Sequence, residues 1–153
     1  MNISIRPWME EDANALYHMS MHPFYVKKRI WKYLYPDSFP HALATIHFYQ
    51  QADSSKFLYR AILCDHQVCG YVQCEKTAND KAEISYWLDV QFWHMGIMKE
   101  AIHSICVQVF SMFDILQIYA RVEKKNMDSQ HVLEACGFHK EECQNLLIYR
   151  IYR

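Results

Sequence analysis

The hydrophobic pattern between residues 82 and 112 changes its period in the middle, and this change restricts the fold more than any other feature. Residues 82–88 include Ile84, Tyr86 and Trp87, which are β-branched or aromatic, and predict a strand with Glu83 and Ser85 on one face. From Met98 onward, apolar residues recur at steps of three and four, which predicts a long amphipathic helix. We therefore expect the chain to pass from a strand through a short loop directly into a helix.

The loop between this strand and this helix contains Gly96, one of only three glycines in the chain. Glycine adopts positive φ easily and lets a backbone approach a ligand closely. The first N–H groups of a helix have no intrahelical partner, and the helix dipole favours negative charge there. These properties fit a phosphate-binding site. An ordinary strand-to-helix turn explains the same residues, so both interpretations stay open.

Similar patterns predict further elements on both sides of this unit. Acidic residues from Glu10 to Asp12 open a first helix, and Pro40 suits the first position of a second. The connection 65–67 predicts a hairpin, and Gly70 in its second strand indicates a bulge or close packing. The other predicted strands span 2–6, 57–64, 68–75, 116–122, 138 onward and 146–152, and a short helix spans 129–135.

Early hairpins followed by helix crossovers predict a single domain, residues 1–153, of the α/β (α+β) class. We expect a mixed, mostly antiparallel central sheet with helices on both faces. The helix after Pro40 is expected to bury Leu43, Ile46 and either Phe48 or Tyr49. The segment between residues 22 and 40 is irregular and rich in aromatic residues.

Charge and hydropathy exclude several function classes. The net charge is −1, and the longest run of Lys and Arg is the three residues 27–29, so we expect no nucleic-acid partner. No apolar run approaches the roughly 18 residues that a membrane span needs, and the N-terminus shows no signal-peptide pattern. The sequence therefore predicts a cytoplasmic protein without a membrane partner.

The six cysteines and nine histidines show little metal-ligand spacing. No two cysteines form a C-x-x-C pair, and His18 and His22 form the one H-x-x-x-H pair in the sequence. Most of the cysteines fall in predicted strands or in the long helix, where free Cys behaves as a small buried hydrophobic residue. We expect neither a metal site nor a disulfide framework.

Two stretches, AEISYWL at 82–88 and FWHMGIMKEA at 92–101, resemble the acetyl-CoA-binding core of GNAT N-acetyltransferases. The resemblance is closest to the branch that acetylates ribosomal-protein N-termini and polyamines. Arg6-Pro7-Trp8 resembles that branch's opening strand, and residues 126–138 resemble its N-x-x-S-x-x-x-L-E-x-x-G-F segment. The resemblance implies the GNAT fold, acetyl-CoA as co-substrate and an amine as acceptor. It also implies that the segment 22–40 covers the acceptor cleft and that the protein forms a homodimer, as is common in the family.

The resemblance also implies which residues hold acetyl-CoA. Pantetheine would bond to backbone groups, and the pyrophosphate would bond to loop amides. Asn126 would either cap the helix near Ser129 or bond to the cofactor. The residues so assigned are Leu88, Asp89 and Val90 for pantetheine, and Met95, Gly96, Ile97, Met98 and Lys99 for the pyrophosphate. His94 departs from the usual glycine of the family and would cost roughly 1 kcal/mol or more at positive φ. Lys124 and Lys125 are either ribose-phosphate contacts or solvated side chains.

For catalysis, the resemblance implies Glu83 as the group that takes the proton of the amine and Ser129 as the donor to the departing thiolate. A backbone N–H near residues 88–90 would stabilise the oxyanion. Glu83 would otherwise be a solvated or cross-strand-paired residue, and Ser129 would otherwise be the N-cap of its helix. Leu133 replaces the tyrosine that many family members use as an acid, and Ser85 replaces a glycine.

These residues predict an N-acetyltransferase that moves the acetyl group of acetyl-CoA to a primary amine by direct attack on the thioester. The acceptor is a small molecule or a peptide N-terminus, and the sequence does not separate the two. The departures at Ser85, His94 and Leu133 support an alternative, a non-catalytic GNAT-fold module that binds CoA or a protein partner.

Overall fold

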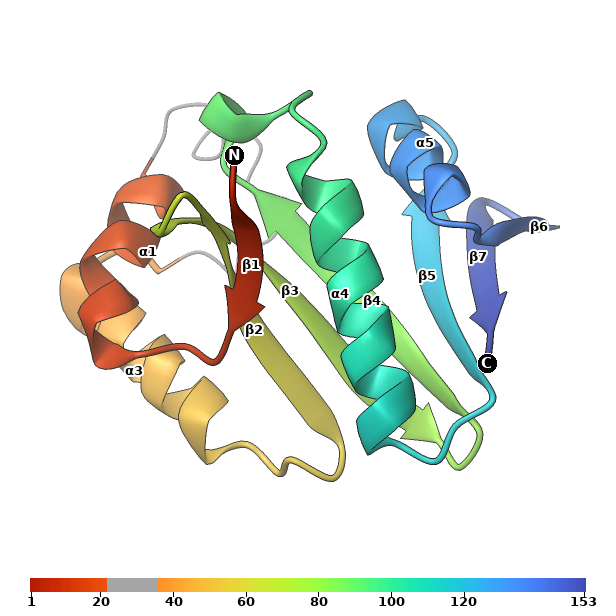
Figure 1. The fold of residues 1–153 in the computed structure, drawn as a ribbon, viewed down its shortest axis with the longest axis horizontal. Helices are drawn as coiled ribbons and strands as arrows, with labels where there is room; N and C mark the ends of the chain where they lie inside the picture. The colour runs from red at the N-terminus through yellow and green to blue at the C-terminus, as the bar shows by residue number, and fades with distance from the viewer. Residues whose placement is uncertain (22–35) are drawn as a thin grey trace.

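A computed structural model describes residues 1–21 and 36–153 of the chain. One seven-stranded sheet, in the order β1-β2-β3-β4-β5-β7-β6, is covered by helices (Figure 1). The strands are β1 (Ile3–Arg6), β2 (Phe57–Cys64), β3 (Gln67–Ala78), β4 (Lys81–Leu88), β5 (Gln117–Glu123), β6 (His139–Cys143) and β7 (Leu146–Tyr152). The helices are α1 (Ala13–Ser20), α3 (Phe39–Gln51), α4 (Ile97–Met112) and α5 (Met127–Ala135), with 3₁₀ turns η1 (Glu10–Asp12) and η2 (Val90–Phe92). The predicted mixed, mostly antiparallel sheet is confirmed.

Strands β4 and β5 form the parallel pair of this sheet, and the other neighbouring strands are antiparallel. Their pairing runs only from Lys81 opposite Gln117 to Glu83 opposite Tyr119. In Figure 1 the two strands lie side by side at one end and diverge toward the end where α4 begins. The residues of β4 after Glu83 therefore present an edge that β5 does not pair.

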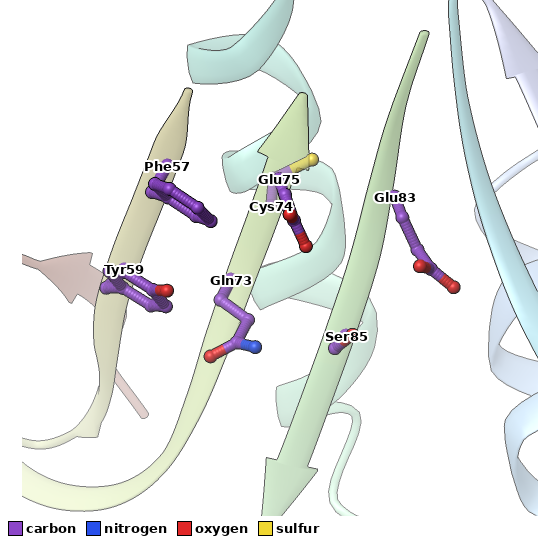
Figure 2. Close-up of a pocket in the computed structure, with 7 residues that line it drawn as sticks. All are labelled: Phe57, Tyr59, Gln73, Cys74, Glu75, Glu83 and Ser85. Carbon is purple, nitrogen blue, oxygen red and sulfur yellow. The ribbon is translucent and has the colours of Figure 1, made fainter. Parts of the chain in front are cut away.

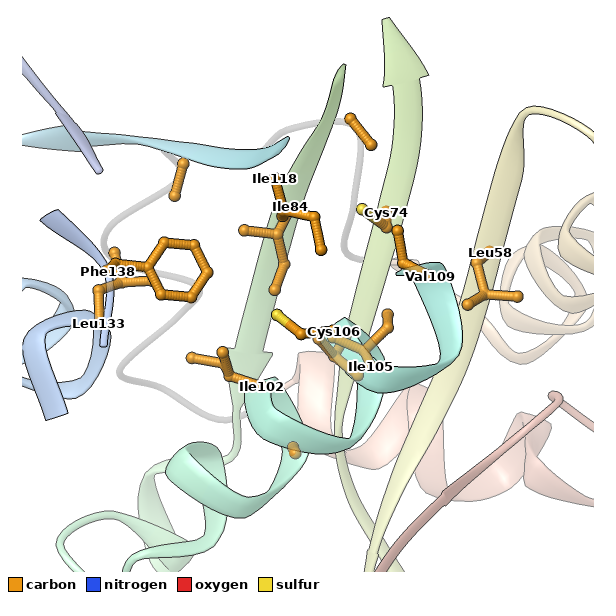
Figure 3. Packing of buried hydrophobic residues seen from close by; sticks show 14 of the residues in the cluster. Leu58, Cys74, Ile84, Ile102, Ile105, Cys106, Val109, Ile118, Leu133 and Phe138 are labelled. Carbon is orange, nitrogen blue, oxygen red and sulfur yellow. The ribbon is translucent and has the colours of Figure 1, made fainter. Parts of the chain in front are cut away.

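Helix α4 packs on one face of the sheet because its apolar stripe is continuous. Ile102, Ile105 and Val109 are fully buried, as the change of period in the sequence predicts. They lie against Ile84 and Cys74 from the sheet (Figure 3). Burying each such aliphatic side chain stabilises the fold by roughly 1.5–3 kcal/mol. This core fixes the position of the first turn of α4 relative to the end of β4.

The other face of the sheet carries α1 and α3 over a second, smaller core. Ile46 and Ala42 are buried in α3, while Leu43 and Tyr49 are half-buried. Phe48 is 62% exposed, so Tyr49 is the aromatic residue that this helix directs toward the core. Alternation along β4 places Glu83 and Ser85 on this side and Ile84 on the α4 side, as the sequence predicts.

The hairpin between β2 and β3 follows the predicted positions. Asp65 and His66 both have positive φ, at 48° and 70°, which matches the right-handed twist of the strands in a two-residue turn. Gly70 shows both predicted features, because the β2–β3 register shifts beside its partner Ile62 and a Cβ at Gly70 would lie 2.3 Å from the Trp87 carbonyl oxygen. Only glycine fits this close approach of two strands.

Two helix starts differ from the prediction. Helix α3 begins at Phe39 rather than at Pro40, because the Ser38 side chain accepts a hydrogen bond from the His41 N–H at 3.2 Å and caps the helix. Helix α5 begins at Met127 rather than at Ser129, for a related reason given below. The aromatic residues predicted to cover the acceptor lie mostly at positions 22–35, outside the described residues.

Three further predictions concern the cysteines, membrane spans and metal sites. All six cysteines are free thiols, and four of them are buried. In the described part of the chain, no helix is long and apolar enough to cross a bilayer. Residues 1–21 and 36–153 also bring together no group of three or more metal-ligating side chains.

Candidate active site

The first turn of α4 lies at the end of β4, beside the edge that β5 leaves unpaired (Figure 1). Gly96 is the N-cap of this helix, with φ 78° and ψ 4°, and it has open space around the position of a Cβ. No side chain of a described residue caps the helix. The amides of Ile97, Met98 and Lys99 therefore lack the intrahelical partners that later residues have. Their donor set and the open space at Gly96 fit a diphosphate.

His94 stands where the family usually has glycine, and its backbone adopts the left-handed conformation that is unfavourable for other residues. Its φ is 61°, in the left-handed region, and its side chain is exposed. This conformation costs a non-glycine residue roughly 1–2 kcal/mol. Met95 between the two positive-φ residues is 48% exposed. The loop thus reaches the same kind of turn that two glycines would give, at an energetic cost.

The end of β4 presents fewer free backbone groups than the resemblance implies. The Asp89 N–H donates to the Cys69 carbonyl at 2.8 Å, so alternation in an antiparallel ladder turns the groups of Leu88 toward β5. The Leu88 carbonyl accepts a hydrogen bond from the Trp93 indole at 2.8 Å. The Val90 carbonyl accepts from the Trp93 N–H at 3.2 Å. A carbonyl oxygen keeps a second lone pair, so these groups are occupied in part.

The 3₁₀ turn η2 explains this occupancy. Asp89 is buried, with 6% exposure, and its side chain accepts from the Gln91 N–H at 3.4 Å as the cap of η2. Its carbonyl accepts from the Phe92 N–H at 2.9 Å. The Val90 N–H donates to no group in residues 1–21 and 36–153. Val90 is therefore the residue whose N–H is available at the end of β4.

Glu83 is paired with Arg121, which lies on the neighbouring strand β5. The Arg121 Nε donates to Glu83 Oε2 at 2.5 Å, and Nη2 donates to Oε1 at 3.1 Å. The Glu83 side chain is 15% exposed, and that of Arg121 is 61% exposed. The hydrogen bond to Glu83 raises the pKa of Arg121 above its usual value. The cross-strand pairing that the sequence left as an alternative is therefore present.

Ser129 and Tyr86 join their hydroxyl groups in a hydrogen bond between α5 and β4. Asn126 caps α5, because its Oδ1 accepts from the Ser129 N–H at 3.2 Å. The alternative that made Ser129 the cap is therefore wrong, the capping role open for Asn126 is confirmed, and the Ser129 hydroxyl is available for another role. Burial raises the pKa of Tyr86 well above its usual value, although the bond to Ser129 opposes the shift. Tyr86 therefore stays protonated at neutral pH.

The two predicted catalytic residues lie on opposite faces of the sheet. Glu83 is on the face that carries α1 and α3, and Ser129 is on the side of α4 and α5. The unpaired edge of β4 lies between them. Leu133 is fully buried and has no access to the site. Lys125 pairs with Glu123 at 3.8 Å, and both side chains are largely exposed.

Sequence reasoning missed Arg121, Tyr86 and Trp93 as residues of the site. The register of a parallel pair joins Arg121 to Glu83 across 38 residues, and no local pattern reports it. Tyr86 carried a signal, since it alternates with Glu83 and Ser85 and so had to face α4. Trp93 follows a turn that the strand pattern did not indicate.

Comparison with known proteins decides the family. A family model described as the acetyltransferase (GNAT) domain matches residues 2–139. The chain belongs to the GNAT acetyltransferase family. Of the segment that the family model matches, the structure describes everything except residues 22–35, and it includes β4, the first turn of α4 and Ser129. The chain thus carries an acetyltransferase domain, as the sequence predicted.

Individual relatives agree with this assignment. A probable N-acetyltransferase of Bacillus subtilis (strain 168), YjcK, is 38% identical over 69 residues, which cover 45% of this chain and 38% of that protein's length. The structure resembles RimL, the ribosomal L7/L12 α-N-protein acetyltransferase, in complex with coenzyme A, with a TM-score of 0.79, 18% identity and coverage of 99% and 94% of the two chains.

A third comparison involves the microcin C7 self-immunity acetyltransferase MccE in complex with acetyl-CoA and AMP. The TM-score is 0.80 at 20% identity, with coverage of 99% of this chain and 92% of that chain. At this level of identity, the two solved structures show that the GNAT fold is shared. Both were solved with coenzyme A or acetyl-CoA bound.

Proposed function

We propose that the chain transfers the acetyl group of acetyl-CoA to a primary amine, a small molecule or a peptide N-terminus. The observation that carries the proposal is the divergence of β4 and β5 beside the uncapped first turn of α4. This arrangement offers donors for a diphosphate and a strand edge that β5 does not pair for an extended arm. Acetyl-CoA supplies the activated acyl group when it is bound.

The amides of Ile97, Met98 and Lys99 would hold the pyrophosphate, and Gly96 would let the backbone approach it. The groups of Leu88 that alternation turns toward β5 would align the pantetheine arm, and the Val90 N–H would donate to the thioester carbonyl oxygen. Such donors are fixed before the reaction and need no reorganisation. The assignments of Asp89, Met95 and Asn126 to the cofactor remain part of this proposal.

Glu83 would accept the proton of the amine. An amine with a pKa near 10.4 costs about 4.6 kcal/mol to deprotonate at neutral pH, so a nearby carboxylate matters. Arg121 uses one lone pair on each Glu83 oxygen, and each oxygen keeps another for a proton or a water molecule. Arg121 would thus orient Glu83 and leave it able to accept the proton, which then passes to solvent.

Ser129 would donate a hydrogen bond to the departing sulfur, and Tyr86 would orient its hydroxyl. Because Glu83 and Ser129 lie on opposite faces of the sheet, the amine and the thioester would meet between β4 and β5 from opposite sides. The new C–N bond would form as the C–S bond breaks, and the second proton of the nitrogen would pass to the departing sulfur so that CoA leaves as the thiol. This geometry separates the incoming nucleophile from the leaving group.

The pairing of Glu83 with Arg121 also favours the second candidate, a GNAT-fold module that binds CoA or a protein partner without turnover. Calorimetric titration with acetyl-CoA, followed by an assay of CoA release with a panel of amines, separates the two. The enzyme proposal predicts heat and an amine-dependent release of free thiol. Heat without release with any amine supports the non-catalytic module, and absence of both heat and a thermal shift removes the enzyme.

A further inference from the structure

Aromatic rings form a continuous row from β2 to α3 on the sheet face that carries Glu83. Phe57 and Tyr59 stack with ring centroids 5.7 Å apart, and Tyr59 stacks on Tyr49 at 4.5 Å. Phe48 continues the row at 6.2 Å from both tyrosines. Phe48 is 62% exposed, and Phe57 and Tyr59 are half-buried. Such a contiguous, partly exposed aromatic patch is uncommon on a protein surface and marks binding sites.

A groove of about 330 Å³ runs along this row, between α3 and strands β2 and β3. Tyr59, Tyr49 and Phe48 form its apolar wall, and His41, Thr45 and Gln73 supply its polar groups. This volume is within the range of small-molecule sites, which are mostly apolar with a few polar groups. The groove therefore fits a ligand with a flat apolar body.

The groove continues at one end into a small acidic hollow. Tyr59 and Gln73 line both spaces, and the hollow adds Glu75, Glu83 and Ser85 (Figure 2). Partial burial of the Tyr59 ring and the negative charge of Glu75 raise the pKa of Tyr59. An aromatic wall and carboxylates thus meet at a single junction.

The two carboxylates at this junction oppose each other directly across strands β3 and β4. Like charges in this arrangement destabilise a sheet. Arg121 neutralises Glu83, whereas Glu75 forms no ion pair with a described residue. A positive charge placed between the carboxylates would relieve their repulsion. The opposite end of the groove is lined by Ala44, Thr45 and His41, and the nearby Asp37 carboxylate is already bonded to the His41 ring at 3.2 Å.

We propose that this groove is the acceptor site and that it selects a monoamine carrying an aromatic ring on a short alkyl linker. The ammonium group lies at Glu75 and Glu83, where it can lose its proton, and the ring stacks against Tyr59 and Phe48. A polyamine finds a carboxylate without an ion-pair partner among the described residues, Glu75, at one end only. The inference rests on the proposed acetyl transfer for the role of the groove, and it can be tested without acetyl-CoA.

The test is equilibrium binding at pH 7 in the absence of acetyl-CoA, measured by ligand-observed NMR or calorimetry. The ligands are 2-phenylethylamine, butylamine without the ring, 2-phenylethanol without the charge, and spermidine as the polycation. The proposal predicts that 2-phenylethylamine binds most tightly of the four. Tighter binding of spermidine, or equal binding of 2-phenylethanol, overturns it. A dipeptide amide with an N-terminal phenylalanine then shows whether the same chemistry is taken from a peptide.

Variants tie the binding to the groove. Phe48→Ala should weaken 2-phenylethylamine about fivefold and leave butylamine unchanged, because it removes one stacking partner. Phe39→Ala is the matched control, since Phe39 is a similarly exposed ring of α3 that does not line the groove. Glu75→Gln should weaken both amines about threefold and leave 2-phenylethanol unchanged. Equal effects of Phe48→Ala and Phe39→Ala would refute the groove.

The outcome is distinguishable from failure of the proposed function. Binding of 2-phenylethylamine to a protein that does not bind acetyl-CoA would reject acetyl transfer and retain the groove as an amine site. Binding and turnover of other amines, with 2-phenylethylamine unbound, would retain acetyl transfer and reject the groove.

Discussion

Glu83 and Arg121 face each other across the parallel strands β4 and β5 and share two hydrogen bonds, at 2.5 and 3.1 Å. Glu83 is in the last paired position, opposite Tyr119, and Arg121 lies two residues farther along β5, where the strands diverge. The pair holds a carboxylate at the mouth of the gap, on the side of the aromatic groove. Glu83, which the sequence predicts as the proton acceptor, therefore also links β4 to β5 through its side chain.

Glu83→Gln tests the role of this carboxylate. The amide keeps the shape but accepts no proton, so kcat should fall at least tenfold at neutral pH and recover in part at high pH, where the free amine is abundant. The measurement is the pH profile of kcat with an accepted amine. An unchanged rate at neutral pH would remove Glu83 from proton transfer.

Arg121→Gln separates orientation from stability. Because the Arg121 side chain is 61% exposed, loss of the pair should change the free energy of unfolding by less than about 1 kcal/mol. The value of kcat should fall several-fold, since Glu83 loses its orienting partner. Denaturant unfolding and initial rates measure the two effects. Lys125→Gln, which breaks the exposed pair with Glu123, is the control that should leave kcat unchanged.

Ser129→Ala and Tyr86→Phe both remove the hydrogen bond between α5 and β4. If Ser129 assists the departing sulfur directly, Ser129→Ala should lower kcat about tenfold, and Tyr86→Phe should lower it less because the serine hydroxyl remains. KM for acetyl-CoA should stay near the wild-type value in both. A larger loss in kcat for Tyr86→Phe than for Ser129→Ala would instead assign Tyr86 the direct contact.

His94→Gly tests whether the left-handed backbone weakens cofactor binding. Glycine removes the cost of φ 61° and lets the loop adjust, so acetyl-CoA should bind several-fold more tightly. His66→Gly is the matched control, because His66 has φ 70° in the β2–β3 turn. Both variants should shift the melting temperature similarly, and only His94→Gly should change the Kd for acetyl-CoA.

Tyr49 predicts a loss of stability in alkali. Burial raises the pKa of Tyr49 from 10.0 to about 12 in the folded protein. Folding thus favours the protonated form of Tyr49. Its contribution to the free energy of unfolding is complete below pH 10 and disappears as the pH rises through about 12. Tyr49→Phe should lose less stability than wild type between pH 10 and 12, by up to about 3 kcal/mol. Parallel unfolding curves for the two proteins over this window would contradict the shift.

The sequence was sufficient for elements whose periodicity is local. The change of period after residue 88 predicted β4 and α4, and the polar connection 65–67 predicted the hairpin. Gly70 predicted a bulge or close packing, and the structure shows both, the latter against the Trp87 carbonyl oxygen. The family resemblance added the fold, since its motifs keep their order over most of the chain.

The sequence could not predict contacts that depend on the register of distant strands. Arg121 meets Glu83 because two strands are paired in parallel, with a helix between them. Asn126 rather than Ser129 caps α5, since both residue types suit that position and the loop decides between them. The 3₁₀ turn at η2, which brings the Trp93 indole to the Leu88 carbonyl, follows a strand pattern without a local signal.

The most direct measurement is the calorimetric Kd of acetyl-CoA for the wild type and for Gly96→Val. The central claim is that the amides after Gly96 bind the diphosphate, so wild type should bind and the variant should bind at least tenfold more weakly, because valine is strained at φ 78°. Circular dichroism and a melting curve confirm that the variant is folded. Equal affinities in two folded proteins, or no heat from wild type at millimolar acetyl-CoA, would contradict the account.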